Sequence, residues 1–282
     1  NPGCRETNGP TGAADPVPPW PYRICCQNRK AVSEGVHRVH TEDSSSAMPA
    51  NAPTAPVFTP RERKVITRFR TPAAVQRFLN ALPYHAGSSS NQLTLRSFRG
   101  VVRHQTAHCL EAVLTAAVIL EQHGYPPLAL SFESIDQLDH VLFIYRHRGR
   151  WGSVARSRDP GLHGRKPVFR TTRALALSYV EPYVDLTGRI TGYAVIDLRR
   201  LGRYDWRLSN RNVWKAERIL LDAPHRPIRT PSQRIDRWRA RYRRFAGRFP
   251  DRKPMFFSGQ NQWSELPAQF RHIIGRSETR RV

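Results

Sequence analysis

The chain has 282 residues, of which 46 are Lys or Arg and 22 are Asp or Glu, giving a net charge of +24. This length suits one sizeable domain with tails, or two small domains. No apolar run approaches the roughly 18–20 residues that a membrane span needs, and no signal-peptide pattern opens the sequence. We therefore expect a protein with no membrane span.

The four cysteines do not form a disulfide framework. Cys4, Cys25 and Cys26 lie near the N-terminus, and Cys109 stands alone in the apolar part of the chain. Small domains stapled by disulfides instead show several cysteines distributed through one core. We therefore expect a reducing, cytoplasmic setting.

Composition changes twice along the chain. Residues 1–60 are rich in Pro, Ala, Ser, Asn and Thr, which is typical of a disordered or low-complexity leader. Residues 61–200 carry most of the Leu, Val, Ile and Phe and are expected to form the main domain. Residues 201–282 are predicted to be a basic, mainly helical C-terminal extension.

Helices and a strand are predicted in the first half of the main domain. Thr71 and Pro72 suit an N-cap and a first helical position, and the apolar pattern that follows ends at Pro83. After a Gly/Ser-rich loop at 86–91, a strongly apolar helix is predicted over about 107–123, followed by Gly124 as its C-terminal glycine. A buried strand follows at 128–132.

The next segment has the pattern of a β-hairpin. Strands are predicted at 140–146 and 150–157, joined around Arg148 and Gly149. In that register His140 lies opposite Ser157. Asp159 follows two residues later with the same parity, so its side chain is expected on the same face as His140, about 7–8 Å away across the diagonal. A short helix at 173–179 and a strand at 190–198 are predicted next.

An Arg-rich amphipathic helix is predicted from Ser232 to Phe249. One interpretation docks its aromatic stripe on the core, with the arginine stems reaching into water. The other makes it a surface that binds nucleic acid or a membrane surface, although the high arginine content is equally typical of ordinary surface positions. The residues assigned to polyanion binding are Arg237, Arg241 and Arg244.

Cys109 has the sequence position of a reactive thiol. It opens the predicted apolar helix, and the positive end of a helix dipole lowers the pKa of a thiol there. The backbone N–H groups of the same turn are able to stabilise an oxyanion. Taken alone, a free cysteine on an apolar helix is most commonly a small buried residue without a catalytic role.

The order of Cys109, His140 and Asp159 is that of a nucleophile, a base and a carboxylate that orients the base. His104 and His108 are alternative partners of the thiol, and Ser157 is the nearest polar alternative to Asp159. Two residues are candidates for an oxyanion or auxiliary role, namely Gln105 and His108. In the following loop, His163, Arg165 and Lys166 are candidates for binding an acidic substrate group.

These residues resemble the core of the transglutaminase-like superfamily, a papain-like cysteine-enzyme fold. Cys109 matches the nucleophile, His140 the base, Trp151 the aromatic residue of the second strand, and Asp159 before Pro160 the orienting carboxylate. The longer run from Trp151 to Phe169 is similar to a bacterial subfamily. The resemblance implies an α+β fold, with the helix of the nucleophile packed on an antiparallel sheet. The basic, helical C-terminal extension is expected in addition to this core.

The resemblance also implies a cysteine-dependent acyl-transfer enzyme that acts on amide or peptide bonds, with hydrolysis favoured slightly over transamidation. The expected partner is a protein, peptide or amide substrate, with no cofactor. No Cys-x-x-Cys or His-Glu-x-x-His spacing indicates a metal site. Two alternatives remain: a non-enzymatic module that binds nucleic acid or another polyanion through the Arg-rich region, and a structural protein with a degenerate site.

Overall fold

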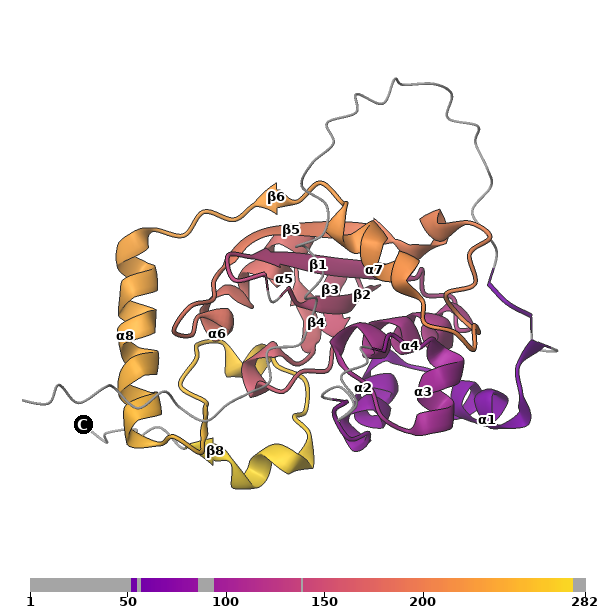
Figure 1. Ribbon diagram of the computed structural model, residues 1–282, viewed down its shortest axis with the longest axis horizontal. Coiled ribbons are helices and arrows are strands. Elements are labelled where there is room, and N and C mark those ends of the chain that lie inside the picture. Colours follow the sequence, from indigo (N-terminus) through magenta and orange to yellow (C-terminus); the bar gives the residue numbers. More distant parts are fainter. Residues whose placement is uncertain (1–51, 55–56, 86–93, 138, 276–282) are drawn as a thin grey trace, which may run out of the picture.

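The protein has an α+β fold built on one antiparallel sheet (Figure 1). The computed structural model describes residues 52–54, 57–85, 94–137 and 139–275. The predicted leader lies almost wholly outside these residues, as do three of the four cysteines and the loop predicted at 86–91. The sheet has the order β4-β3-β2-β1-β5-β6. Its strands are β1 Leu128–Ser134, β2 Val141–His147, β3 Arg150–Val154, β4 Arg165–Phe169, β5 Ile190–Asp197 and β6 Arg226–Pro227.

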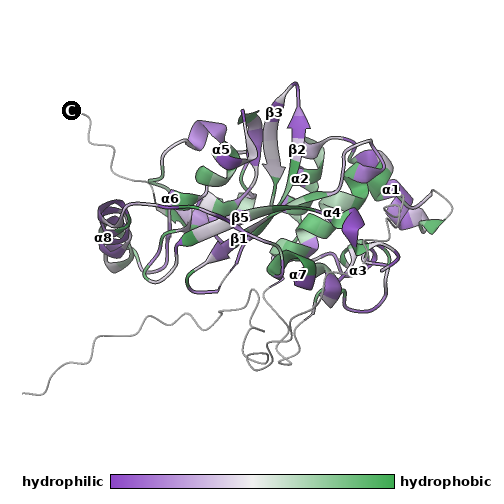
Figure 2. Cartoon of the chain, turned by 90° about the horizontal axis from the view of Figure 1, so that it is seen from above, coloured by the Kyte–Doolittle hydropathy of each residue, from purple (hydrophilic) through white to green (hydrophobic). Residues whose placement is uncertain are grey.

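Helices cover both faces of this sheet (Figures 1 and 2). The helices are α1 Pro60–Arg68, α2 Pro72–Ala81, α3 Phe98–His104, α4 Cys109–Glu121, α5 Thr172–Leu177, α6 Val180–Tyr183, α7 Trp214–Leu221 and α8 Ser232–Arg248. Alternate residues of β2 belong to two separate hydrophobic cores. Phe143 is part of the core that contains residues of α1 to α4 and α7, whereas Ile144 is part of the core that contains residues of α5 and α6. This alternation follows from the period of two residues in a strand.

Helix α4 is the centre of the larger core. Residues 109–120 are all buried, so the helix is enclosed on every side rather than along one stripe. It begins at Cys109, two residues later than predicted, because the extended His108 caps it: His108 Nδ1 accepts a hydrogen bond from Leu110 N at 3.2 Å. Gly124 follows the helix with a φ of 81°, the left-handed conformation for which a glycine was predicted.

The β2–β3 hairpin has the predicted register. Phe143 pairs with Val154 and His147 with Arg150, and both turn residues have positive φ. The ladder stops at Val154, three residues earlier than predicted. The reason is Gln76 of α2, whose side-chain amide bonds both the N–H (3.0 Å) and the carbonyl (2.8 Å) of Ala155 in place of a partner strand. The chain therefore turns away from the sheet before Ser157.

The region after residue 201 is interwoven with the sheet and only partly helical. Strand β6 extends the sheet beside β5, and two further short strands pair in parallel, β7 Lys253–Pro254 and β8 Ile274–Gly275. Helix α8 lies at the edge of the molecule (Figure 1). Its aromatic stripe faces inward: Trp238 packs on the smaller core, and Phe245 lies 5.5 Å from Phe256 between ring centroids. Docking of this stripe on the protein agrees with the first interpretation of the helix.

Gly164 is a position where the fold leaves no room for a side chain. A Cβ there would lie 2.2 Å from Gln76 Oε1 and 2.6 Å from the Ser153 carbonyl oxygen. Because overpacking a close-packed site is destabilising, we expect Gly164→Ala to lower the free energy of unfolding by about 1–3 kcal/mol. Urea titrations of the variant and the wild type measure this difference. The control is Gly247→Ala in α8, where a Cβ meets nothing within 4 Å. Equal stability of the two variants would contradict this close approach.

Candidate active site

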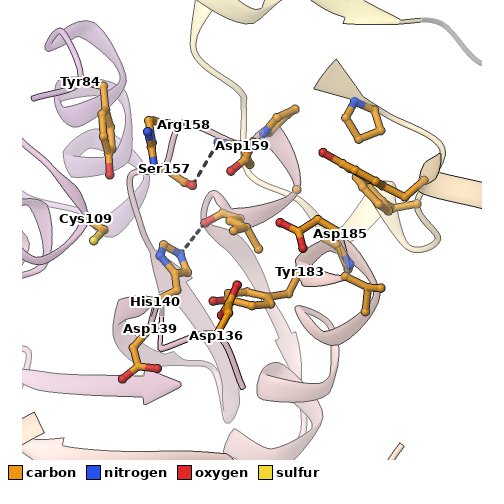
Figure 3. A pocket seen from close by; sticks show the side chains of 18 residues that line it. Tyr84, Cys109, Asp136, Asp139, His140, Ser157, Arg158, Asp159, Tyr183 and Asp185 are labelled. Carbon is orange, nitrogen blue, oxygen red and sulfur yellow. Dashed lines mark hydrogen bonds between the residues drawn. The ribbon is translucent and has the colours of Figure 1, made fainter. Parts of the chain in front are cut away.

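Cys109, His140 and Asp159 line one cavity of about 130 Å³ (Figure 3). Three different parts of the fold supply them. Cys109 comes from the first turn of α4, His140 immediately precedes β2, and Asp159 precedes the short 3-10 turn Pro160–Leu162. Figure 3 shows Cys109 and His140 on neighbouring walls of the cavity. The structure thus gathers the three residues that the sequence predicted to act together.

His140 is held in one orientation by a backbone carbonyl. Its Nε2 lies 2.9 Å from the carbonyl oxygen of Leu162. Since a carbonyl oxygen only accepts hydrogen bonds, Nε2 carries the proton, and in the neutral ring Nδ1 is the basic nitrogen. The side chain is 5 % exposed, and Phe132 N donates to the His140 carbonyl at 2.8 Å, so strand β1 fixes the backbone as well. His140 therefore has the tautomer that a base acting through Nδ1 needs.

Asp159 lines the cavity, but its carboxylate is bonded to Lys253 rather than to His140. Its Oδ1 accepts from Lys253 Nζ at 2.7 Å, and the Asp159 side chain is about half exposed. The backbone of Asp159 has a second connection to the site, because its carbonyl accepts from Leu162 N at 3.1 Å and closes the turn. Asp159 thus opens the turn whose last residue, Leu162, holds the His140 ring.

One buried arginine, Arg165, holds this turn in place, and a second, Arg156, holds the chain just before it. Arg165 is fully buried and donates to the carbonyls of Gly161 (2.6 Å) and His163 (2.8 Å), and its guanidinium lies 4.0 Å from the Tyr179 ring centroid. Arg156, also fully buried, donates to the carbonyls of Leu82, at 2.8 Å, and of its neighbour in the chain. Burial lowers the pKa of both, that of Arg156 to about 10. The carbonyls stabilise these cations by hydrogen bonding.

A buried ion network lies beneath Cys109. Glu111 is fully buried and accepts from Arg96 Nε at 2.8 Å, from Arg96 N at 2.9 Å and from His108 N at 3.2 Å. Burial raises the pKa of Glu111, but the charges of His108 and Arg96 outweigh it and the pKa is lowered. Burial likewise opposes charge on His108, yet Glu111 and a hydrogen bond with Cys109 leave its pKa raised. The network fixes the first turn of α4.

His108 and His104 differ from His140 in what their rings do. His108 uses Nδ1 to cap α4, and its Nε2 lies 3.2 Å from the Thr94 carbonyl oxygen. His108 thus caps the helix, and because it also has a hydrogen bond with Cys109 it stays an alternative partner of the thiol. His104 is exposed at the end of α3. Gln105 turns its side-chain amide to the Val102 carbonyl at 2.7 Å, and it is not among the residues that line the cavity in the described part of the chain.

The loop after Asp159 corrects one prediction. His163 and Arg165 are fully buried instead of presented to a substrate, because His163 donates through Nε2 to the Ser157 carbonyl at 2.9 Å and stacks edge-on against Phe270. Burial holds the pKa of His163 well below its usual value. Lys166 is exposed and donates to the Asn261 carbonyl at 2.9 Å. An acidic substrate group is therefore not bound by the buried pair.

Arg237, Arg241 and Arg244 lie together on α8. They line a shallow groove around Trp238, and all three are exposed. Arg241 also lies 3.8 Å from Glu181 and 4.2 Å from the ring centroid of Phe256.

Within residues 52–54, 57–85, 94–137 and 139–275, no group of three His, Cys, Asp or Glu side chains is placed to hold a metal ion. None of the helices described there has the length and apolar character of a membrane span.

The chain was compared with known proteins in sequence and in structure. No family model and no curated protein matches its sequence. Among solved structures it is similar to Legionella pneumophila LapG in an EGTA-treated form, with 11% identity and a TM-score of 0.30 over 52% of this chain and 88% of LapG.

The Glu111 network predicts how stability depends on pH. A carboxyl whose pKa is lowered by folding stabilises the protein above its unfolded pKa, and this stabilisation is lost as pH falls through the folded value. We expect Glu111→Gln to lower the free energy of unfolding by about 3 kcal/mol at pH 7, because Arg96 loses its buried partner. Between pH 6 and pH 3 the variant should then lose less stability than the wild type.

Urea titrations across that pH range check this expectation. Glu265→Gln is the matched control, since Glu265 is exposed. Parallel pH profiles of the wild type and Glu111→Gln would contradict the assigned role of Glu111.

Proposed function

We propose that the protein is a cysteine-dependent acyl-transfer enzyme acting on amide or peptide bonds. The observation that carries the proposal is the hydrogen bond from His140 Nε2 to the Leu162 carbonyl, which leaves Nδ1 as the basic nitrogen in the cavity that Cys109 lines. The arrangement of a helix-borne thiol against an antiparallel sheet also fits the expected transglutaminase-like core. A thiol and a correctly tautomerised imidazole in one cavity are the minimal parts of such a site.

The reaction follows from these positions. His140 Nδ1 takes the proton of the Cys109 thiol, and the thiolate attacks the acyl carbon to give a tetrahedral intermediate. The N-terminus of α4 stabilises the oxyanion. His140 then returns the proton to the departing amine as the C–N bond breaks and the acyl group remains on sulfur. Water releases the acyl group by the reverse sequence; hydrolysis is favoured over transfer because water needs no second binding site.

Two groups are candidates for orienting His140. The predicted triad gives this role to the Asp159 carboxylate, which lines the cavity and bonds Lys253. The Leu162 carbonyl is already bonded to the ring. We assign the orienting role to the Leu162 carbonyl. Asp159 has an indirect role, because it begins the turn that positions this carbonyl.

The reactivity of Cys109 tests the proposal. Iodoacetamide labelling at pH 6, read by mass spectrometry on the Cys109 peptide, is expected to be faster in the native protein than in urea, because His140 removes the thiol proton. His140→Gln should slow the native reaction at least tenfold, whereas His147→Gln, at the exposed far end of β2, should not. Equal labelling of native and unfolded chains, independent of His140, would exclude an activated thiol.

Asp159→Asn in the same assay distinguishes the two orienting groups. A rate within about threefold of the wild type is expected if the Leu162 carbonyl holds the ring. A loss as large as that of His140→Gln would return the orienting role to the Asp159 carboxylate.

A second candidate function is binding of a polyanion by α8. The groove around Trp238 brings four guanidinium groups together on one exposed face of the helix, which suits phosphate groups. The arginines that form it are Arg234, Arg237, Arg241 and Arg244. This function is compatible with the first, because the residues of α8 that line the groove do not include Tyr242, the residue of α8 that lines the cavity.

Replacing Arg237, Arg241 and Arg244 together by Glu is expected to abolish binding of single-stranded RNA at low salt in a fluorescence anisotropy titration. Wild-type affinity should fall steeply with salt, since counterions are released from the nucleic acid. Replacing exposed Arg61, Lys64 and Arg77 by Glu makes the same change of charge elsewhere. Equal losses in both triple variants, or no wild-type binding at low salt, would remove α8 as the binding surface.

A further inference from the structure

His163 connects the two ends of the turn that holds the His140 ring. Its side chain is fully buried, and its Nε2 donates to the carbonyl of Ser157, six residues earlier, at 2.9 Å. The turn Pro160–Leu162 lies between these two residues, and the Leu162 carbonyl bonds His140 Nε2. This carbonyl belongs to the peptide bond that joins Leu162 to His163. The imidazole of His163 therefore helps to fix the carbonyl that orients His140.

The hydrogen bond to Ser157 is made by a neutral His163 ring. Because a carbonyl oxygen only accepts hydrogen bonds, Nε2 carries the proton and Nδ1 is unprotonated. Nδ1 is buried and has no hydrogen-bond partner in the part of the chain that the structure describes. A second proton would place a donor on Nδ1 with nothing to accept it. A buried N–H group without an acceptor is costly, so the closed turn disfavours this proton.

The charges that act on the His163 ring are positive. Arg156 Nη1 donates at 3.3 Å to the same Ser157 carbonyl, and Arg165 donates at 2.8 Å to the His163 carbonyl. His140 is the third titratable group beside it. Burial, and then Arg156, His140 and Arg165, hold the pKa of His163 well below its usual value, although the bond to Ser157 opposes them.

Two uncharged groups also pack against His163. Phe270 meets the ring edge-on, with ring centroids 5.2 Å apart. The Tyr179 hydroxyl donates to the His163 carbonyl at 2.9 Å, and burial raises the pKa of this tyrosine, so it stays neutral. Protonation of His163 thus meets neither an acceptor for Nδ1 nor a negative charge among these described neighbours.

We propose that His163 is a positioning residue for His140 and that its protonation in acid opens the turn. The protonated ring leaves the Ser157 carbonyl, and the Leu162 carbonyl then releases the His140 ring. This inference rests on the proposed function, because it describes how the same site is regulated by pH.

The direction of the effect follows from proton binding. Above about pH 6.5, the usual pKa of histidine, His163 is neutral whether the turn is closed or open. Below this pH the open turn binds a proton that the closed turn does not bind. The equilibrium constant for opening therefore rises about tenfold for each unit by which the pH falls, until the closed turn also becomes protonated.

Amide hydrogen exchange at Leu162 measures this opening on the full chain. Its N–H donates to the Asp159 carbonyl at 3.1 Å within the turn, so exchange requires the turn to open. The observed rate divided by the intrinsic rate of a free amide at the same pH gives the opening constant. In the wild type we expect this constant to rise about tenfold per pH unit between pH 6.5 and pH 5.

His163→Gln is expected to keep the opening constant of Leu162 nearly independent of pH, because glutamine offers a donor to Ser157 and does not titrate. His163→Leu removes the donor as well, so the constant should rise at least tenfold at pH 7.5 and again not depend on pH. His272→Gln is the matched control, since His272 is exposed. It should keep the wild-type dependence. Urea titrations check that each variant is folded.

Iodoacetamide labelling of Cys109 at the same pH values connects the turn to the site. The rate in the wild type divided by the rate in His163→Gln should fall at least threefold from pH 7 to pH 5. The protonation of His140 itself cancels in this ratio, because both proteins contain it.

The two measurements distinguish this inference from the proposed function. Parallel pH dependences of Leu162 exchange in the wild type and in the variants at His163 would overturn the positioning role. A difference in exchange with a constant labelling ratio would overturn its effect on the site. If Cys109 is not activated in the wild type at any pH, the proposed function fails, whereas Leu162 exchange still decides whether His163 holds the turn.

Discussion

The geometry of the site depends on a guanidinium group buried among backbone carbonyls. Arg165 is fully buried, and in the described chain its hydrogen bonds go to carbonyl oxygens on either side of Leu162 rather than to a carboxylate. A buried cation is costly unless every nearby acceptor is aimed at it. The turn around it consequently has little freedom, and the Leu162 carbonyl, which lies between these two acceptors in the chain, is fixed against the His140 ring.

A carbonyl in this position has a chemical consequence. It sets the tautomer of the His140 ring as well as a carboxylate would, because it accepts only from a protonated nitrogen. It carries no charge, however, so in the proposed reaction it would stabilise an imidazolium at His140 less than the aspartate of a triad does. The aspartates along the same cavity supply negative potential from a greater distance. The site therefore separates two tasks, orientation and charge stabilisation, that one carboxylate performs in a triad.

The parts of the site that follow from local pattern could be predicted from the sequence. The apolar run after Cys109 gives α4, and the Arg148-Gly149 pair gives the hairpin register, since each depends on neighbours in the chain. The end of β3 could not be predicted, because Gln76 terminates it from a distant helix. The role of the Leu162 carbonyl could not be predicted either, because every residue has a backbone carbonyl and the residue type does not indicate which one contacts His140. The buried arginine is equally hidden in a chain with so many exposed ones.

Charge is distributed so that the cavity and the rest of the molecule have opposite signs. The net charge of +24 repels cations at long range, but in water at 0.15 M salt this field is screened beyond about 8 Å. Inside the cavity, low-dielectric walls and fixed carboxylates act over shorter distances and are screened far less. The arginines of α8 line a separate groove, and none of them is among the described residues that line the cavity of Cys109.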